Sequence, residues 1–317
     1  MRRVGVEIEL QGIAVEDLAT LVAATLGGVA TAVSSAEYSI DVPGHGSYRV
    51  EIDFALLKQL ARERDPDAGG DADLFAALAV DALQAASSVV VPCEIVSPPI
   101  PLDRLAAAMD PLVDALRRAG AKGTRQSLLY AFGLHLNVEA PSLDADTITR
   151  YLRAFVCLYD WIVDESQIDL SRRMTPYIDA YGRDYELLVA DPDYAPDLAR
   201  LIDDYLAHNP TRDRALDMLP MFTHLDEQRV RQIVDDPLVK ARPAFHYRLA
   251  NSSVDEPGWS VAYPWNLWMQ IETLAQDPAR LNECARLFIE DRQRLLQGFH
   301  KQWVAELRAW LAGADAS

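Results

Sequence analysis

Apolar and acidic residues alternate in the stretch Val4-Gly5-Val6-Glu7-Ile8-Glu9-Leu10. Successive side chains of a β-strand point to opposite faces, so Glu7 and Glu9 share one face at a spacing of about 6.6 Å. Two carboxylates this close repel each other unless they are solvated, protonated or bridged by a cation. Hard divalent cations such as Mg²⁺ prefer carboxylate oxygens as ligands. The stretch therefore predicts a strand whose acidic face is either a solvated edge or part of a metal site.

The composition limits the classes of function. Lys and Arg number 30 against 48 Asp and Glu, a net charge of −18, which argues against a nucleic-acid backbone as the main ligand. The three cysteines (Cys93, Cys157 and Cys284) form no CxxC pair, so neither a disulfide framework nor a zinc site is indicated. No apolar run reaches the ~18 residues of a membrane span, and Glu7 and Glu9 interrupt the region where a signal peptide would be apolar. We therefore expect a cytoplasmic protein that binds neither nucleic acid nor membrane.

Hydrophobic spacing and turn signals predict alternating short strands and helices. Besides the first stretch, strands are expected at 29–33, 38–42, 47–53, 88–96, 130–138, 245–251 and 259–263. Helices are expected at 15–26, 54–61, 73–86, 105–116, 148–162, 197–207, 226–235, 264–276 and 279–311. No linker sets off residues 143–240, so we interpret them as a helical insertion within a single domain of residues 1–317.

Acidic and imidazole groups recur on separate predicted strands. Besides the first pair they are Glu51, Asp53, Glu94 and His135. If these strands share one sheet, the groups converge on one face as a site for two or more metal ions. Each residue alone has a plainer interpretation, since a single Glu on a strand is usually solvated and a single His is usually a hydrogen-bonded polar residue.

Three motifs in order resemble the signatures of a known family. They are Gly5-Val6-Glu7-Ile8-Glu9, Glu94-Ile95-Val96-Ser97-Pro98-Pro99 and Gly133-Leu134-His135-Leu136-Asn137. Together they resemble the amidoligase family of the glutamine synthetase and glutamate–cysteine ligase superfamily, over most of residues 1–140 and more loosely over 171–275. The resemblance implies an α+β fold, with a curved, mainly antiparallel sheet backed by helices. It also implies an ATP- and Mg²⁺-dependent ligase that joins an acid to an amine of a small molecule or peptide through an acyl phosphate, forming an amide or isopeptide bond.

The resemblance also implies roles for particular residues. Glu7, Glu9 and Glu94 match the family's ligands for Mg²⁺ or Mn²⁺. Glu51 is a candidate for an additional ligand, within the group of residues that bind the cofactor. The residues implied in catalysis are His135, Arg248 and Asn251, and those implied in cofactor binding with Glu51 are Asn137, Arg172 and Arg212. Asn137 stands where the family has a second histidine, and an amide is a poor metal ligand.

One departure from the family pattern leaves several functions open. The family follows its late strand with a run like T-V-E-F-R, whereas this chain has Ser260-Val261-Ala262-Tyr263-Pro264 and lacks both charged groups. Arg172, Arg212, Arg242 or Arg248 are candidates for the missing cation. The alternatives to the ligase are a degenerate member that binds a nucleotide, metabolite or partner without turnover, and a metal-dependent hydrolase that uses no ATP. The sequence identifies neither the acid, the amine nor the oligomeric state.

Overall fold

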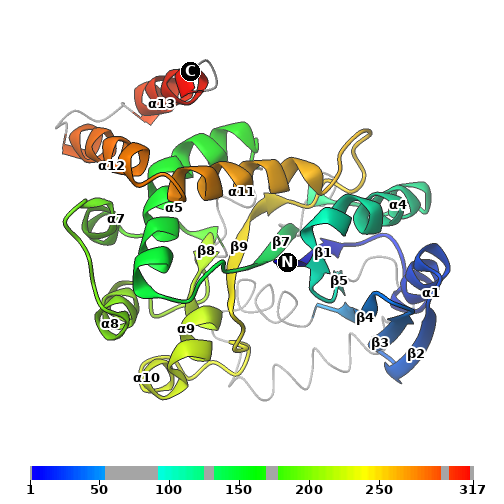
Figure 1. Cartoon of the computed structure of the whole chain (residues 1–317). Coiled ribbons are helices and arrows are strands. Elements are labelled where there is room, and N and C mark those ends of the chain that lie inside the picture. Colours follow the sequence, from blue (N-terminus) through cyan, green and yellow to red (C-terminus); the bar gives the residue numbers. More distant parts are fainter. Residues whose placement is uncertain (1, 54–91, 125–131, 169–177, 294–299, 315–317) are drawn as a thin grey trace, which may run out of the picture. The chain divides into compact units, whose positions relative to one another are not determined.

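The computed structural model describes residues 2–53, 92–124, 132–168, 178–293 and 300–314 of the chain (Figure 1). Its class is α+β, as expected, with nine described strands in a mostly antiparallel arrangement and about ten helices. The chain divides into two compact units, Met1–Asn137 with Ala250–Ala262 and Val138–Leu249 with Tyr263–Ser317. The expectation of a single domain with an insertion stays a prediction.

The first unit contains most of the strands. They are β1 (Arg3–Leu10), β2 (Val29–Ser34), β3 (Glu37–Val42), β4 (Gly46–Ile52), β5 (Cys93–Val96), β6 (Ile100–Pro101) and the start of β7 (Gly133–Glu139). Their order is β2-β3-β4-β5-β1-β7, and β6 pairs with β1. Helix α1 (Val15–Leu26) packs on β3 and on α4 (Leu105–Arg118). A 3-10 turn, Leu102–Arg104, leads into α4.

Local sequence explains these elements. Val6 and Ile8 on β1 are each 1% exposed, so the apolar half of the alternation faces the core as predicted. Helix α1 ends where Gly27 adopts φ 70°, a left-handed conformation that glycine enters without steric cost. β3 and β4 form the hairpin expected from the turn at residues 43–46, with Val42 opposite Gly46.

The described strands differ from the curved sheet that the resemblance implies. Their sheet is neither closed nor notably curled. Bulges are the usual source of strong sheet curvature. Among the strand pairs whose register the structure describes, only β2–β3 has a register shift, between Ala32 and Ser34. The other strand pairs with a described register are regular and therefore add no such curvature.

Gly123 lies where a later segment of the chain joins the first unit. Its N–H donates to Asp255 Oδ1 at 3.2 Å, and the next residue, Thr124, donates its N–H to Ser252 O at 2.8 Å. A Cβ added at Gly123 would overlap the Ser252 carbonyl oxygen and lie 2.7 Å from Asp255 Oδ1. Only a residue without a side chain allows this approach.

We therefore expect Gly123→Ala to lower the free energy of unfolding by about 2–3 kcal/mol, because the backbone must move apart to admit the methyl group. Denaturant unfolding measures the change. The control is Gly182→Ala, since Gly182 has φ −64° and an added Cβ there meets no atom within 4 Å. Equal stability of the two variants would contradict the close approach at Gly123.

The second unit is mainly helical. Its elements are the end of β7, α5 (Ala145–Glu165), α7 (Arg183–Ala190), α8 (Leu198–His208), β8 (Leu216–Asp217), α9 (Leu219–Leu225), α10 (Glu227–Arg231), β9 (Ala244–Asn251), α11 (Ala262–Ala275), α12 (Pro278–Gln293) and α13 (His300–Ala314), with the ends of β9 and the start of α11 at the unit boundary. Asp144 caps α5 by accepting a hydrogen bond from Thr147 N at 2.7 Å. α5 contacts α7, α8, α12 and α13. Buried aromatic rings fill this core, including the edge-to-face pair Phe155–Tyr247, whose centroids are 6.4 Å apart.

Several expected elements differ from those observed. Residues 259–263 are not a strand, because α11 begins at Ala262 and carries Pro264 in its first turn, where a missing N–H costs no helical hydrogen bond. The expected helices at 54–61 and 73–86 lie outside the described residues. The last expected helix corresponds to α12 and α13, on either side of the undescribed residues 294–299. α7, α9 and β8 were not predicted. In the described part of the chain, no helix has the length and apolar character needed to cross a membrane.

Candidate metal site

A row of four glutamates crosses four neighbouring strands of the first unit. Glu37 on β3 lies opposite Glu51 on β4, Glu51 lies opposite Glu94 on β5, and Glu94 lies opposite Glu9 on β1. Like charges directly opposite each other destabilise a sheet. A row of this kind therefore needs protons, basic partners or a cation to be stable.

β7 places an imidazole beside the β1 carboxylates. His135 Nδ1 lies 3.0 Å from Glu7 Oε2, and its Nε2 lies 3.3 Å from Glu9 Oε1. A neutral imidazole has one N–H donor, so only the doubly protonated ring donates to both carboxylates. His135 thus lies between the two carboxylates, with one ring nitrogen near each of them.

Two further contacts fix these carboxylates. Asn137 donates Nδ2–H to Glu7 Oε1 at 2.8 Å, so both oxygens of Glu7 are occupied. The N–H of Gly133 donates to Glu9 Oε2 at 2.6 Å, which leaves Glu9 Oε1 facing the ring of His135. A Cβ added at Gly5 would be in van der Waals contact with Asn137 Cβ, at 3.4 Å, so the glycine of the first motif lies directly beside the Asn137 side chain.

Two glutamates of the row have raised pKa values, which shows that their ionised forms are unfavourable there. Burial raises the pKa of Glu94 well above its usual value, and the nearby carboxylates of Glu7, Asp53, Glu9 and Glu51 raise it further. Burial also raises the pKa of Glu51, although Arg49 opposes the shift through an ion pair of 2.9 Å. Arg49 attracts Glu94 as well, but its ion pair is with Glu51. A cation beside Glu94 would relieve the repulsion.

The residues present fit a divalent cation. One ligand atom from each of Glu9, Glu94 and His135 lies within 4.8 Å of the others. Two carboxylates suit Mg²⁺ and Mn²⁺, whereas the single imidazole is a ligand that Mn²⁺, Fe²⁺ and Zn²⁺ accept more readily than Mg²⁺. Glu7 bonds the other ring nitrogen, in the manner of the carboxylate–histidine–metal arrangement that orients a ligating imidazole.

The remaining candidates from the sequence lie in different places. Arg248 is in the second unit, 7% exposed, and donates from Nη1 to the carbonyl oxygen of Arg212 at 2.8 Å. Arg212 itself pairs with Asp236 at 3.5 Å. Asn251 is buried at the end of β9, in the first unit. Arg172 lies outside the described residues. The structure thus brings the acidic and imidazole candidates together, while the roles of the arginines rest on the family pattern.

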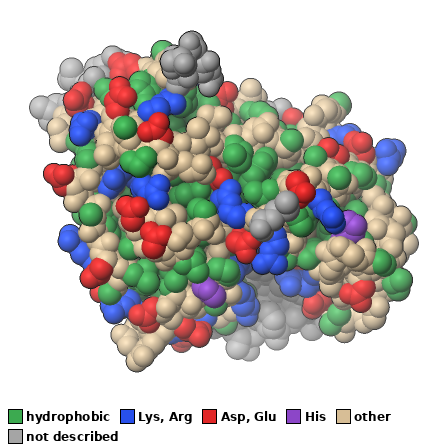
Figure 2. Space-filling view, in the orientation of Figure 1, with side chains coloured by type: hydrophobic (Ala, Val, Ile, Leu, Met, Phe, Trp, Pro, Cys, Tyr) green, Lys and Arg blue, Asp and Glu red, His purple; other side chains and the backbone are tan. Residues whose placement is uncertain are grey.

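Sequence reasoning missed Glu37 as a member of the acidic row, and it did not predict the ion pair of Arg49 with Glu51. The turn at residues 43–46 could have predicted the position of Glu37. A hairpin that pairs Val42 with Gly46 also pairs Glu37 with Glu51. Arg49 shares a strand face with Glu51 two residues away, and the alternation alone shows that parity. On the face of the molecule in Figure 2, basic side chains lie among acidic ones.

Comparison with known proteins identifies the family. The sequence matches the family described as "Putative amidoligase enzyme" over residues 1–270 of 317. No curated protein and no solved structure is significantly similar to the chain. The matched region covers well over half of the sequence and includes all three motifs, the acidic row and His135. The chain belongs to the amidoligase family.

Proposed function

We propose that the protein is an ATP-dependent carboxylate–amine ligase that requires Mg²⁺ or Mn²⁺ and joins the acid and amine groups of small molecules or peptides through an acyl phosphate. The observation that carries the proposal is the convergence of Glu9, Glu94 and His135 within 4.8 Å in the part of the chain that matches the family. A carboxylate is a poor electrophile, and phosphorylation by ATP gives it a good leaving group. Phosphoryl transfer needs positioning and positive charge more than covalent help from the protein.

In this proposal each residue of the cluster has one task. Glu9, Glu94 and the Nε2 atom of His135 hold the cation, which when bound neutralises phosphate oxygens of the nucleotide. Glu7 holds Nδ1 of His135, and Asn137 holds Glu7 through the 2.8 Å hydrogen bond. The proposal thus assigns Glu7 to orienting the ring, whereas the family motif implies that Glu7 is a metal ligand.

Residues outside the cluster are assigned to the cofactor or the substrate by their place in the family pattern. Glu51 is a further metal or cofactor ligand in the acidic row. Arg248, Arg212, Arg172 and Asn251 bind phosphate or the substrate carboxylate. Arg248 in particular supplies the cation that the late-strand run of the family would otherwise carry.

A second candidate function is binding without turnover. The observation that favours it is the start of α11 at Ala262, in the run where the family has a strand with Glu and Arg. Here the run has neither charged group, and its backbone is helical from Ala262 onward. A family member that lost these groups would keep the metal cluster and bind a nucleotide or metabolite without transferring a phosphoryl group.

We expect Mg²⁺ or Mn²⁺ to raise the melting temperature and ATP to raise it further in the presence of the metal. A ligand that binds only the folded state, at 100 times its Kd, stabilises the protein by about 2.7 kcal/mol, or roughly 5 °C or more. Differential scanning fluorimetry measures both shifts. If saturating metal and nucleotide leave the melting temperature unchanged, the cluster is a solvated acidic surface.

ADP release in a matrix of candidate acids and amines then distinguishes the functions. The ligase is expected to release ADP only when an acid, ATP and metal are present, with further stimulation by the matching amine. Nucleotide binding in a calorimetric titration with no ADP release from any pair would favour the binding protein. Metal-dependent hydrolysis in the absence of ATP would instead identify a hydrolase that uses the same carboxylates.

A further inference from the structure

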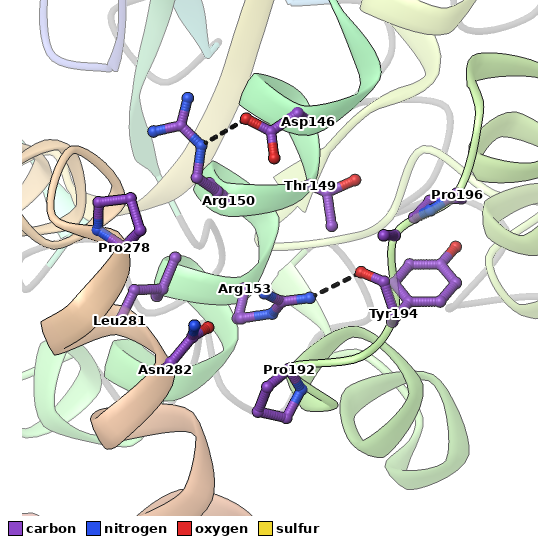
Figure 3. Close-up of a pocket in the computed structure, with 11 residues that line it drawn as sticks. Asp146, Thr149, Arg150, Arg153, Pro192, Tyr194, Pro196, Pro278, Leu281 and Asn282 are labelled. Atoms are coloured by element: carbon purple, nitrogen blue, oxygen red, sulfur yellow. Dashed lines mark hydrogen bonds and ion pairs between the residues drawn. The ribbon is translucent and has the colours of Figure 1, made fainter.

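The second unit contains a pocket of about 220 Å³, and none of its lining residues belongs to the three family motifs. It lies between α5, the segment after α7, and the start of α12 (Figure 3). The residues that matter for its chemistry are Thr149, Arg150, Arg153, Tyr194 and Asn282. Pockets for drug-sized ligands are about 300–1,000 Å³. This pocket therefore suits a small ligand or one group of a larger ligand.

Arg153 is a buried cation in the wall of this pocket. It is 6% exposed, and its Nε donates to Val189 O at 2.8 Å. Its Nη2 donates to Asp191 O and Tyr194 O at 2.8 and 2.9 Å. Its Nη1 makes no hydrogen bond to any residue that the structure describes. Figure 3 shows the guanidinium in the midst of the labelled residues.

Among the residues that the structure describes, no carboxylate contacts Arg153 directly. Within the described ranges, the ion pairs include none with this residue. A buried charge is costly unless it is paired, and carbonyl dipoles compensate it only in part. Burial accordingly lowers the pKa of Arg153, despite the more distant Asp191 and Asp146. The positive charge of Arg153 is therefore only partly compensated, and an anion in the pocket would be attracted to it.

Two neutral hydrogen-bonding groups lie in the same pocket. The Thr149 side chain is on α5, is 4% exposed and has a hydroxyl with no hydrogen-bond partner among the described residues. Figure 3 shows the Asn282 amide on α12 directed toward Arg153. A hydroxyl and an amide N–H both donate well to an oxyanion.

Two further charged residues of the pocket, Arg150 and Asp146, form an ion pair with each other. Arg150 Nε binds Asp146 Oδ2 at 3.0 Å, and its Nη1 donates to Ala275 O at 2.8 Å. In Figure 3 its guanidinium points away from Arg153. Arg150 and Asp146 together leave little net charge, so the field in the pocket is set mainly by Arg153.

We propose that this pocket binds a small oxyanion, a carboxylate or phosphate group, through Arg153 Nη1, the Thr149 hydroxyl and the Asn282 amide. Arg153 is already held by three backbone carbonyls through Nε and Nη2, so the position of its free Nη1 is fixed before an anion binds. The unpaired hydroxyl of Thr149 gains the partner that it otherwise lacks. The pocket shares no lining residue with the acidic cluster, and its proposed role does not depend on the proposed ligase activity.

The test is isothermal titration of the full chain with inorganic phosphate and, separately, with acetate, at a constant ionic strength maintained with chloride. At least one anion is expected to bind with a stoichiometry of one. Thr149→Val keeps the side-chain shape and removes one donor to a charged group, so it is expected to weaken binding about tenfold. Asn282→Ala is expected to weaken it by a similar factor.

Thr223→Val is the matched control. Thr223 is 2% exposed, and its hydroxyl likewise has no partner among the described residues, but it is on α9 and does not line the pocket. Its substitution is expected to leave the anion affinity unchanged. Binding of phosphate alone identifies a phosphorylated ligand, and binding of acetate alone identifies a carboxylate ligand. No binding of either anion, or equal affinity in wild type, Thr149→Val and Asn282→Ala, would overturn the proposal.

Discussion

Glu94→Gln is expected to make the metal-free protein more stable at neutral pH and to abolish its stabilisation by Mg²⁺ or Mn²⁺. The substitution keeps the shape of the side chain and removes the charge that faces the neighbouring carboxylates of Glu7, Glu9, Glu51 and Asp53. It also removes a ligand from the group of Glu9, Glu94 and His135. We expect metal affinity to fall more than about 100-fold, since changes to groups that only support a metal ligand already cost 10–100-fold.

The pH dependence of stability shows why Glu94→Gln is expected to be more stable than wild type at neutral pH. The pKa of Glu94 is raised in the folded state above the ordinary value of 4.5. Below that value both states carry the proton, and Glu94 costs no stability. As the pH rises past it, the unfolded state ionises first, so unfolding releases a proton and the free energy of unfolding falls with pH. The fall ends above the folded-state pKa, and Glu94→Gln removes this contribution.

Thermal unfolding of wild type and variant from pH 4 to pH 8, in the presence of a chelator, measures the effect. Glu16→Gln is the control, because Glu16 is an exposed residue of α1 and its substitution removes the same formal charge. The control is expected to follow the wild-type profile and to keep the metal-dependent shift. A Glu94→Gln protein that is still stabilised by metal as wild type is would contradict the assignment of Glu94 as a ligand.

Arg248→Lys is expected to reduce the rate of ADP release about 10³-fold or more while leaving nucleotide binding largely intact. This expectation rests on the proposed ligase function, in which Arg248 supplies the cation that the run Ser260–Pro264 lacks. Loss of such a cation from phosphoryl transfer costs about 10³–10⁵-fold in rate. Lysine keeps the charge but lacks the planar fork, so it does not reproduce a two-point contact with a phosphate.

Arg231→Lys is the matched control for this variant. Arg231 is also a partly buried arginine of the second unit whose side chain donates to backbone carbonyls, those of Asp236 and Val239. Its substitution is expected to alter stability and not turnover. Steady-state kinetics and nucleotide titration of both variants separate the two effects. Wild-type turnover in Arg248→Lys would show that another group supplies the charge.

Some features of the fold follow from local sequence because their causes are local. The alternation in residues 4–10 specifies β1 and places Glu7 and Glu9 on one face, whatever the strand pairs with. The turn at residues 43–46 specifies the β3–β4 hairpin, and Gly27 ends α1. The start of α11 escaped this reasoning because the apolar residues 259–263 suit either a strand or the entry to a helix.

The sequence by itself determined the α+β class, the main strands of the first unit and the family, because strand parity, turn chemistry and motif order are carried by neighbouring residues. Only the tertiary structure decided which charges meet. The contact of His135 with Glu7 joins residues 128 positions apart, and the row from Glu37 to Glu9 depends on the register of three strand pairs. The isolation of Arg153 is likewise a property of packing, because α5 buries its guanidinium against backbone carbonyls and no carboxylate among the described residues forms an ion pair with it. Register and burial depend on pairing between distant segments, and local periodicity does not specify that pairing.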